Sequence, residues 1–314
     1  MKSIHLIAPS GANLDPKSPL VGIEWLKQQG IAIQNAECVN RIYERFAGGD
    51  EHRLADLNDL PKLSNEQVVM SMRGGYGMHR LLPDIDWAAI AKAIQNGLQI
   101  CGHSDFTAFQ LGLLAKTGAI SLSGPMLNYD FGRMDESGSP ISPDEFMWKH
   151  FISAIDDRKL NCSVSAAQAF LGNTNVGVLN GLLWGGNLAI LAGLVGTSYL
   201  PDQQKTKSGI LFLEDVNEHP YRIERMLMQL LDSGILSNQA AILLGGFSAY
   251  RLYDNDNGYS LERAIELIRK RLPKEIPILT DLPFGHQPNK LTLPVGAIAQ
   301  LEFSSGGFSL RAQW

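Results

Sequence analysis

The sequence has few cysteines and no long apolar run. Its three cysteines, Cys38, Cys101 and Cys162, lie far apart and form no CxxC pair. This spacing excludes a disulfide framework and a cysteine-based zinc site, and it is typical of buried thiols in a reducing compartment. No apolar run reaches the roughly 18–20 residues that a bilayer span requires, and the run that follows Met1 is too short for a signal peptide. We therefore expect a cytoplasmic chain with no membrane partner.

Positive charge is also sparse. The chain has 27 lysines and arginines against 32 acidic residues, a net charge of -5 with histidine neutral, and no basic run. This balance argues against nucleic acid as a partner. None of the seven histidines has a second histidine or a cysteine at metal-ligand spacing, so we expect no metal site.

Apolar residues make up 45% of the 314 positions, which is enough for a large core, and the length allows two domains. In the first half, short apolar runs alternate with stretches of helical spacing. The runs are at 4–8, 67–72, 98–101 and 120–122, and the helical stretches are at 19–29, 87–94 and 106–116. This alternation predicts a mainly parallel sheet with helices on both faces.

Polar and turn residues gather between Arg133 and Asp144, so we place a domain boundary near residues 155–170. The second half alternates again. Strands are expected at 176–183, 209–213, 240–244 and 276–280, and helices at 188–194, 221–231 and 261–271. The sequence thus predicts two α/β domains, residues 1–160 and residues 161–314.

Three polar residues follow apolar runs in different parts of the chain. Ser104 follows one run, Glu214 follows a second, and His286 comes shortly after a third. Ligands of open parallel sheets bind outside the carboxyl ends of the strands, so these side chains are expected to meet there. A serine, an acid and a histidine can serve as nucleophile, orienting group and base, and their order along the chain is that of α/β-hydrolases.

The segment around Ser104 partly matches the G-x-S-x-G nucleophile turn. It reads GHSDF, so Phe106 replaces the second glycine. A sharp strand-to-helix turn would expose the Ser104 hydroxyl and aim the backbone N–H of Asp105 at a developing oxyanion. The alternative is that Ser104 or Asp105 only caps the following helix.

The segment Arg73–Gly77, RGGYG, ends another apolar run. Its glycines let backbone N–H groups approach a carbonyl oxygen, so Gly74 and Gly75 are candidate donors. A phosphate-binding turn is a second interpretation, although the segment lacks G-x-G-x-x-G and P-loop spacing. The third interpretation is an ordinary tight turn.

The candidate acid and base each have an alternative. Glu214 is nearest to its strand and is expected to be held rigidly, whereas Asp215 and Glu218 suit the N-cap or first turn of the following helix. His286 lies in a loop between a glycine and a proline, where core packing is unfavourable. The alternative for it is an ordinary surface histidine.

Together these segments resemble the LD-carboxypeptidase (muramoyltetrapeptide carboxypeptidase) family of serine peptidases. The resemblance extends from residue 8 to about 295, nearly the whole chain, and the family's Ser-Glu-His triad falls on Ser104, Glu214 and His286. The linked motifs, in the family's order, are APSG at 8–11, RGGYG at 73–77, RLLP at 80–83 with Asp86, GHSD at 102–105, WGGN at 184–187, LED at 213–215, PYR at 220–222 and PFGH at 283–286.

The resemblance implies a two-domain α/β fold. The N-terminal domain would be flavodoxin-like, with a mainly parallel sheet, and would carry Ser104. A smaller α/β C-terminal domain would carry Glu214 and His286. The active site would then lie at the domain interface.

The implied activity is that of a serine carboxypeptidase of peptidoglycan recycling, which releases terminal D-alanine from murein tetrapeptides by cleaving an L,D-peptide bond. The amide nitrogens of Asp105 and of Gly74 or Gly75 would stabilise the oxyanion, and no cofactor is needed. Arg73 is the candidate for binding the terminal carboxylate, because a guanidinium matches a carboxylate fork. Tyr76 is a second candidate substrate-binding residue. The alternative for Arg73 is an ion pair with a structural acid.

The expected partner is therefore a small muropeptide. A homodimer is an expected assembly, although the sequence leaves the oligomeric state open. Two other functions stay open as well. Some members of the family cleave peptide-nucleotide antibiotics and confer immunity. A flavodoxin-like binding protein would instead use the glycine-rich turns for phosphate and have no nucleophile.

Overall fold

The computed structural model describes residues 1–63, 67–165, 177–304 and 306–314. Its first sheet has six strands in the order β11-β5-β4-β3-β1-β2, and every neighbouring pair is parallel except β11 with β5. The strands are β1 (Ser3–Ile7), β2 (Ala32–Gln34), β3 (Val68–Ser71), β4 (Gln99–Gly102), β5 (Ser121–Ser123) and β11 (Leu293–Val295). The order 2-1-3-4-5 is that of flavodoxin-like sheets, the fold that the family resemblance implied for this part of the chain.

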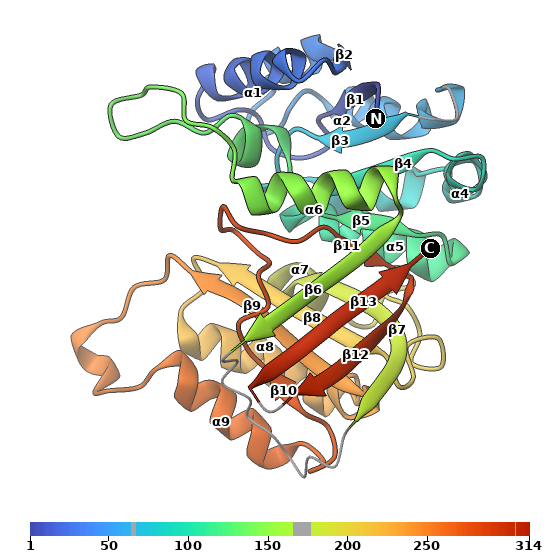
Figure 1. Cartoon of the computed structure of the whole chain (residues 1–314). Helices are drawn as coiled ribbons and strands as arrows, with labels where there is room; N and C mark the ends of the chain where they lie inside the picture. Colours follow the sequence, from blue (N-terminus) through green and yellow to red (C-terminus); the bar gives the residue numbers. More distant parts are fainter. Residues whose placement is uncertain (64–66, 166–176, 305) are drawn as a thin grey trace.

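Helices cover both faces of this sheet (Figure 1). On one face, Ile4 and Leu6 pack in a cluster with Leu26 of one helix and Phe151 of another. On the other face, buried side chains of four helices join a second cluster. The first face is covered by α1 (Lys17–Gln28) and α6 (Glu145–Asp156), and the second by α2 (Asp50–Asn58), α3 (Met78–Leu81), α4 (Trp87–Gln95) and α5 (Thr107–Thr117).

The second sheet has seven strands in the order β10-β9-β8-β7-β12-β13-β6. The first four are mutually parallel, and the last three pair antiparallel. The strands are β6 (Lys159–Ser165), β7 (Val178–Asn187), β8 (Ile210–Val216), β9 (Ala241–Ser248), β10 (Ile278–Leu279), β12 (Ile298–Ser304) and β13 (Gly307–Gln313). The helices that accompany them are α7 (Leu188–Gly193), α8 (Pro220–Asp232) and α9 (Leu261–Arg271).

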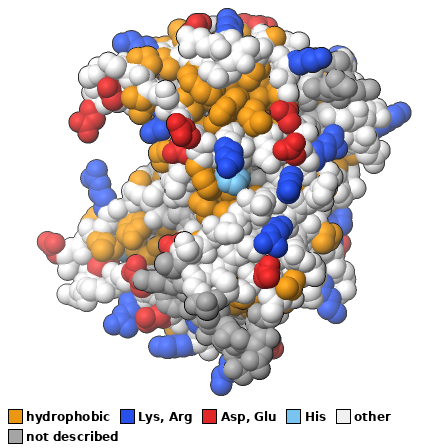
Figure 2. Space-filling model, viewed as in Figure 1, with side chains coloured by type: hydrophobic (Ala, Val, Ile, Leu, Met, Phe, Trp, Pro, Cys, Tyr) orange, Lys and Arg blue, Asp and Glu red, His pale blue; other side chains and the backbone are white. Residues whose placement is uncertain are grey.

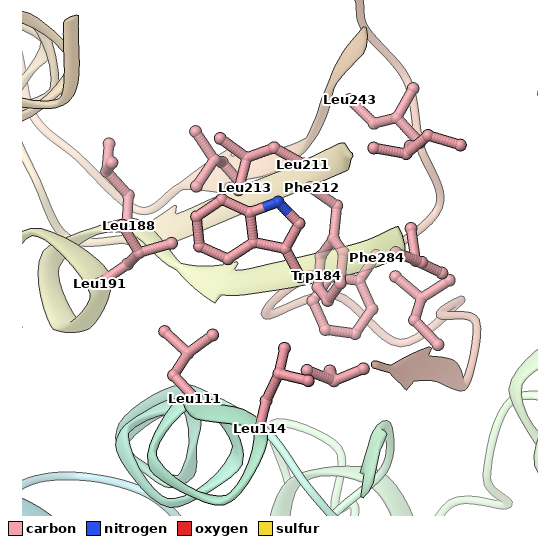
Figure 3. Close-up of a cluster of buried hydrophobic side chains, with 14 of the residues drawn as sticks. Leu111, Leu114, Trp184, Leu188, Leu191, Leu211, Phe212, Leu213, Leu243 and Phe284 are labelled. Atoms are coloured by element: carbon pink, nitrogen blue, oxygen red, sulfur yellow. The ribbon is translucent and has the colours of Figure 1, made fainter. Parts of the chain in front are cut away.

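One buried core joins the two sheets. Leu111 and Leu114 of α5 point toward Trp184 of β7 and Phe284, which belong to the second half of the chain (Figure 3). Asn187 adds a polar contact, because its backbone N–H donates to Thr107 Oγ1 at 3.1 Å. Helix α5, which follows Ser104, is therefore fixed against β7, the strand that pairs with β8 and places Asn187 opposite Glu214.

The predicted alternation of strands and helices is confirmed, and the helix expected at 261–271 matches α9 at both ends. The strand expected at 176–183 begins at Val178, and residue 176 lies outside the described residues. The proposed boundary between residues 160 and 161 falls within β6, a strand of the second sheet. The sequence did not anticipate β11, which leaves the second half of the chain and pairs with β5 of the first sheet.

On the face shown in Figure 2, acidic and basic side chains are interspersed rather than gathered into patches of one sign. No helix within the described residues is long and apolar enough to cross a membrane. All three cysteines are buried and free.

Candidate active site

Ser104 lies on a strained turn at the carboxyl end of β4. The strand ends at Gly102, and Ser104 opens a short 3-10 helix, η4 (Ser104–Phe106), with a φ of 63°. A left-handed φ costs a non-glycine residue about 1–2 kcal/mol, and such outliers concentrate at functional sites. A Cβ added at Gly102 would lie 2.7 Å from the ring of Phe106, so the first glycine of the motif makes room for the residue that replaces the second.

The structure brings the three predicted residues into one hydrogen-bonded chain. His286 Nε2 lies 3.1 Å from Ser104 Oγ, and His286 Nδ1 lies 2.7 Å from Glu214 Oε2. A carboxylate only accepts, so Nδ1 carries the proton and Nε2 is free to accept from the Ser104 hydroxyl. This is the arrangement that activates a serine nucleophile.

Glu214 is held by contacts with Asn187, His286 and Gly285. It is fully buried on β8 and lies opposite Asn187 in the register of β7 with β8. Asn187 Nδ2 donates to Glu214 Oε1 at 3.2 Å. Gly285 approaches so closely that an added Cβ would lie 3.2 Å from Glu214 Oε2, and its φ of 126° favours glycine. The carboxylate that faces His286 therefore has little freedom to turn.

The prediction that Asp215 caps the following helix was wrong. The following helix, α8, begins at Pro220 and is capped by His219. Asp215 is buried within β8, and its Oδ2 accepts from the backbone N–H of Ala189 in the first turn of α7 at 2.9 Å. Glu218 also lies outside the helix and forms a surface ion pair with Arg222. Asp215 is thus a second buried acid beside Glu214.

We expect this buried acid to make stability depend on pH. Burial first, and then the neighbouring Glu214, raise the pKa of Asp215 to about 6 from 3.8. The folded protein then holds the proton more tightly than the unfolded chain does. Stability should therefore decline as the pH rises from about 4 to 6, by at most about 3 kcal/mol.

Thermal melts across this pH range test the expectation. Asp215→Asn cannot titrate, so its melting temperature should gain on that of the parent as the pH rises. Any constant offset from the altered hydrogen bonds would not affect this comparison of slopes. Equal pH slopes in the two proteins would contradict the assignment.

The glycine turn packs directly against Ser104. A Cβ added at Gly74 would lie 2.7 Å from both Cβ and Oγ of Ser104 and 3.2 Å from the backbone nitrogen of Asp105. The carboxylate of Asp105 accepts from the backbone N–H of Met78 at 3.0 Å, which ties the end of the turn to the nucleophile segment. Asp105 is buried, and burial is the main cause that raises its pKa. Its carboxylate thus binds the start of α3, and no side-chain cap of its own helix is present.

Gly74→Ala should lower kcat by about 10²-fold or more, because the added methyl must displace the Ser104 hydroxyl from His286. Gly193→Ala is a matched control, since its Cβ would meet nothing closer than His79 at 3.6 Å. Steady-state kinetics and thermal melts on both variants provide the measurement. A parental kcat in Gly74→Ala would show that the turn is not held this close to Ser104.

A cavity of about 530 Å³ opens over Ser104 and His286. Arg73 lines it and donates to the carbonyl oxygen of Ala12 and, at 3.2 Å, to the hydroxyl of Tyr129. Within the described parts of the chain no carboxylate lies within 4.0 Å of the Arg73 guanidinium, and its buried Nε has no hydrogen-bond partner. The predicted alternative of an ion pair with a structural acid is therefore not what the structure shows.

Tyr76 and Gly75 differ in their placement. Gly75 lines the cavity, with a φ of 111°. Tyr76 does not line it, and its ring lies 6.0 Å from that of Phe46 instead. The role of Tyr76 in substrate binding stays a prediction that the cavity does not favour.

Sequence reasoning missed several residues of this site. A buried polar cluster on the cavity wall consists of Lys290, Asp130 and His103. Tyr129 also lines the cavity. His103 stands in the GHSD motif, but its contact with Lys290 joins segments far apart in the chain. No local pattern marks Lys290, Asp130 or Tyr129. The described residues hold no group of three or more metal-binding side chains.

Fold and site together define a class: a two-domain α/β serine hydrolase with a serine, a histidine and a glutamate in hydrogen-bonding order. Comparison with known proteins narrows this class to one family. Residues 4–124 match the LD-carboxypeptidase N-terminal domain, and residues 180–301 match the LD-carboxypeptidase C-terminal domain. The chain belongs to the LD-carboxypeptidase family, as the sequence motifs predicted, and is a serine carboxypeptidase by class.

Several relatives span nearly the whole chain. The murein tetrapeptide carboxypeptidase of Pseudomonas aeruginosa is 31% identical over 301 residues, which cover 95% of this chain and 92% of that protein. The crystal structure of muramoyltetrapeptide carboxypeptidase from Oxalobacter formigenes is 39% identical, with a TM-score of 0.84, and covers 100% of this chain and 99% of that one. The microcin C7 self-immunity protein MccF of Escherichia coli is 28% identical over 321 residues, covering 93% of this chain and 88% of that protein.

Proposed function

We propose that the chain releases terminal D-alanine from murein tetrapeptides by cleaving an L,D-peptide bond. The observation that carries the proposal is the hydrogen-bonded chain from Ser104 through His286 to Glu214, at 3.1 and 2.7 Å. It faces a cavity large enough for the end of a peptide. Relatives named for this activity match nearly the full length of the chain.

The reaction begins with proton transfer from Ser104 Oγ to His286 Nε2 as the oxygen attacks the scissile carbonyl carbon. Glu214 keeps the Nδ1 proton in place and stabilises the imidazolium that forms. His286 then gives the proton to the departing amine of D-alanine. Water hydrolyses the acyl-enzyme with His286 again acting as the base, and Ser104 is regenerated.

The oxyanion of the tetrahedral intermediate is stabilised by the backbone N–H of Asp105 and of Gly74 or Gly75. The Gly74 turn lies against Ser104, which supports this assignment. One such donor is worth about 3 kcal/mol. Arg73 binds the terminal carboxylate of the substrate, since its guanidinium lines the cavity and forms no ion pair with a carboxylate of the described residues.

The proposal is tested by incubating the purified enzyme with muramoyl tetrapeptide and following the products by mass spectrometry. Loss of a single D-alanine is expected, with no loss from a peptide that ends in L-alanine. The reaction should proceed equally well in EDTA, because every step uses side chains and backbone groups of this chain. An intact tetrapeptide after prolonged incubation would contradict the proposal.

A second candidate function has support from the 28% identity to MccF. In this alternative the same triad cleaves a peptide-nucleotide antibiotic and confers immunity. An aminoacyl sulfamoyl adenylate assayed beside the tetrapeptide separates the two. A kcat/KM higher for the adenylate than for the tetrapeptide would favour immunity over murein processing.

We also propose that residues 1–160 and 161–314 act as two domains with the site between them. We further propose that the enzyme works in the cytoplasm as a homodimer. The family motifs, which lie in both parts of the chain, support the first of these statements. Light scattering of the purified chain and fractionation of cells that express it test the last two.

A further inference from the structure

A buried ion pair crosses between the two halves of the molecule beside the triad. Lys290 Nζ lies 2.8 Å from Asp130 Oδ1, and the two side chains are only 2% and 1% exposed. Of the ion pairs between described residues, this is the one that joins residues before 165 to residues after 177. Lys290 follows His286 by four residues in the same loop. The pair therefore connects the loop of the base to the half of the chain that carries Ser104.

Asp130 is itself fixed on a short π-helical turn, η5 (Leu127–Phe131). Its second oxygen, Oδ2, accepts from the backbone N–H of Met126 at 2.7 Å. Both oxygens of the carboxylate are thus engaged. A π-helical turn is uncommon and often accompanies a functional site.

His103 completes the cluster in a single protonation state. Its Nδ1 lies 2.9 Å from the carbonyl oxygen of Gly124, so Nδ1 must donate. Nε2 then has a free lone pair and accepts from Lys290 Nζ at 3.4 Å. Burial first, and the Lys290 ammonium second, hold the pKa of His103 well below its usual range. The ring is therefore neutral.

His103 adjoins both reacting partners of the triad. His103 directly precedes Ser104 in the chain, and its ring packs edge-on against that of His286, with centroids 5.1 Å apart and planes at 71°. The cluster thus makes contact with the nucleophile through the backbone and with the base through the ring. The proposed reaction uses none of its three side chains.

A buried ion pair is an expensive way to add stability, because desolvation of two charges offsets most of their attraction. Such a pair instead defines a geometry, because the Lys290 ammonium must lie close to both Asp130 Oδ1 and His103 Nε2. We infer that the cluster of Lys290, Asp130 and His103 positions His286 against Ser104 across the two halves of the protein. Lys290 is in this sense a positioning residue, and the inference rests on the proposed role of the triad.

The test measures the reactivity of Ser104 without a peptide substrate. A fluorophosphonate probe reacts with a serine only when a base activates it, so its labelling rate reports on the pair of Ser104 and His286. It also separates this inference from the choice of substrate. If the probe labels Ser104 but the enzyme does not cleave tetrapeptide, the proposed substrate is wrong, and the labelling test of the positioning cluster still applies.

Lys290→Met removes the cation and keeps the length of the side chain. It should label about 10²-fold more slowly, because misplacing a reacting group by about 1 Å costs that much. It should also melt at a lower temperature, since Asp130 is left buried and unpaired. Arg311→Met is the matched control. It breaks an exposed ion pair with Glu302 in the second sheet and should label at the parental rate.

The double variant Lys290→Met/Asp130→Leu separates positioning from stability. With both charges gone, the melting temperature should return toward that of the parent, while labelling stays about 10²-fold slow. A double variant that regains the parental labelling rate would overturn the inference. If neither variant folds, Lys290→Gln serves instead, because its shorter amide can donate to Asp130 but cannot also reach His103 Nε2. It should label about 10²-fold more slowly than the parent, and labelling at the parental rate would refute positioning.

Discussion

Ser104→Ala should lower kcat by at least about 10⁴-fold while the protein remains folded. The expectation follows from the position of Ser104 Oγ, 3.1 Å from His286 Nε2 at the end of a buried strand. Alanine removes the attacking oxygen and leaves the turn and the core unchanged. Steady-state kinetics with circular dichroism provide the measurement. More than a tenth of the parental rate in this variant would rule out Ser104 as the nucleophile.

A companion variant uses the strained backbone at this position. Ser104→Gly removes the same hydroxyl, but glycine tolerates a φ of 63° without penalty. It should therefore be as inactive as Ser104→Ala and more stable than it, by about 1 kcal/mol. Thermal melts of the two inactive variants measure the strain directly. A glycine variant that melts below the alanine variant would show that the turn is not strained.

Glu214→Gln should be nearly as damaging, with kcat lower by about 10⁴-fold, as in the corresponding change in a serine protease. Glutamine keeps the size of the side chain but removes the charge that stabilises the imidazolium. It can also turn its amide N–H₂ toward His286 Nδ1 and favour the wrong tautomer. Glu214 is fully buried and tied to Asn187, and among the described carboxylates it is the one that hydrogen-bonds to His286 Nδ1.

Glu218→Gln is the control for this prediction. Glu218 lies four residues along the same segment but forms a surface ion pair with Arg222, and such a pair contributes about 0–1 kcal/mol. Its loss should leave kcat unchanged and shift the melting temperature only slightly. If Glu218→Gln loses more activity than Glu214→Gln, the acid of the triad has been assigned to the wrong residue.

Local patterns in the sequence were sufficient for the parts of the site that lie at strand ends. A parallel sheet places the carboxyl ends of its strands along one edge, so an apolar run that stops at Ser104 or Glu214 already indicates where those side chains lie. Gly102, two residues before Ser104, also fits the sharp turn at which Ser104 has a left-handed φ, because the missing side chain leaves room for Phe106. The family motifs then selected His286 from seven histidines.

Contacts across the sheets could not be predicted in this way. Asp215 suited a helix cap in the sequence, yet the register of β7 with β8 places Asn187 opposite Glu214 and turns Asp215 toward α7. Lys290 and Asp130 are separated by most of the second half of the chain. Their pairing depends on how the two sheets dock, and docking is decided by the packing of Leu111 and the other core residues rather than by any local motif.

The pairing of β11 with β5 has a consequence for how the protein is made. The five parallel strands of the first sheet are complete at Ser123, but the edge of β5 stays uncovered until Leu293 leaves the ribosome. At typical rates of synthesis that interval is roughly ten to thirty seconds. An open strand edge invites pairing with another chain. The nascent enzyme therefore carries an unpaired strand edge that favours aggregation throughout this interval, and any fragment that stops short of β11 keeps that edge unpaired.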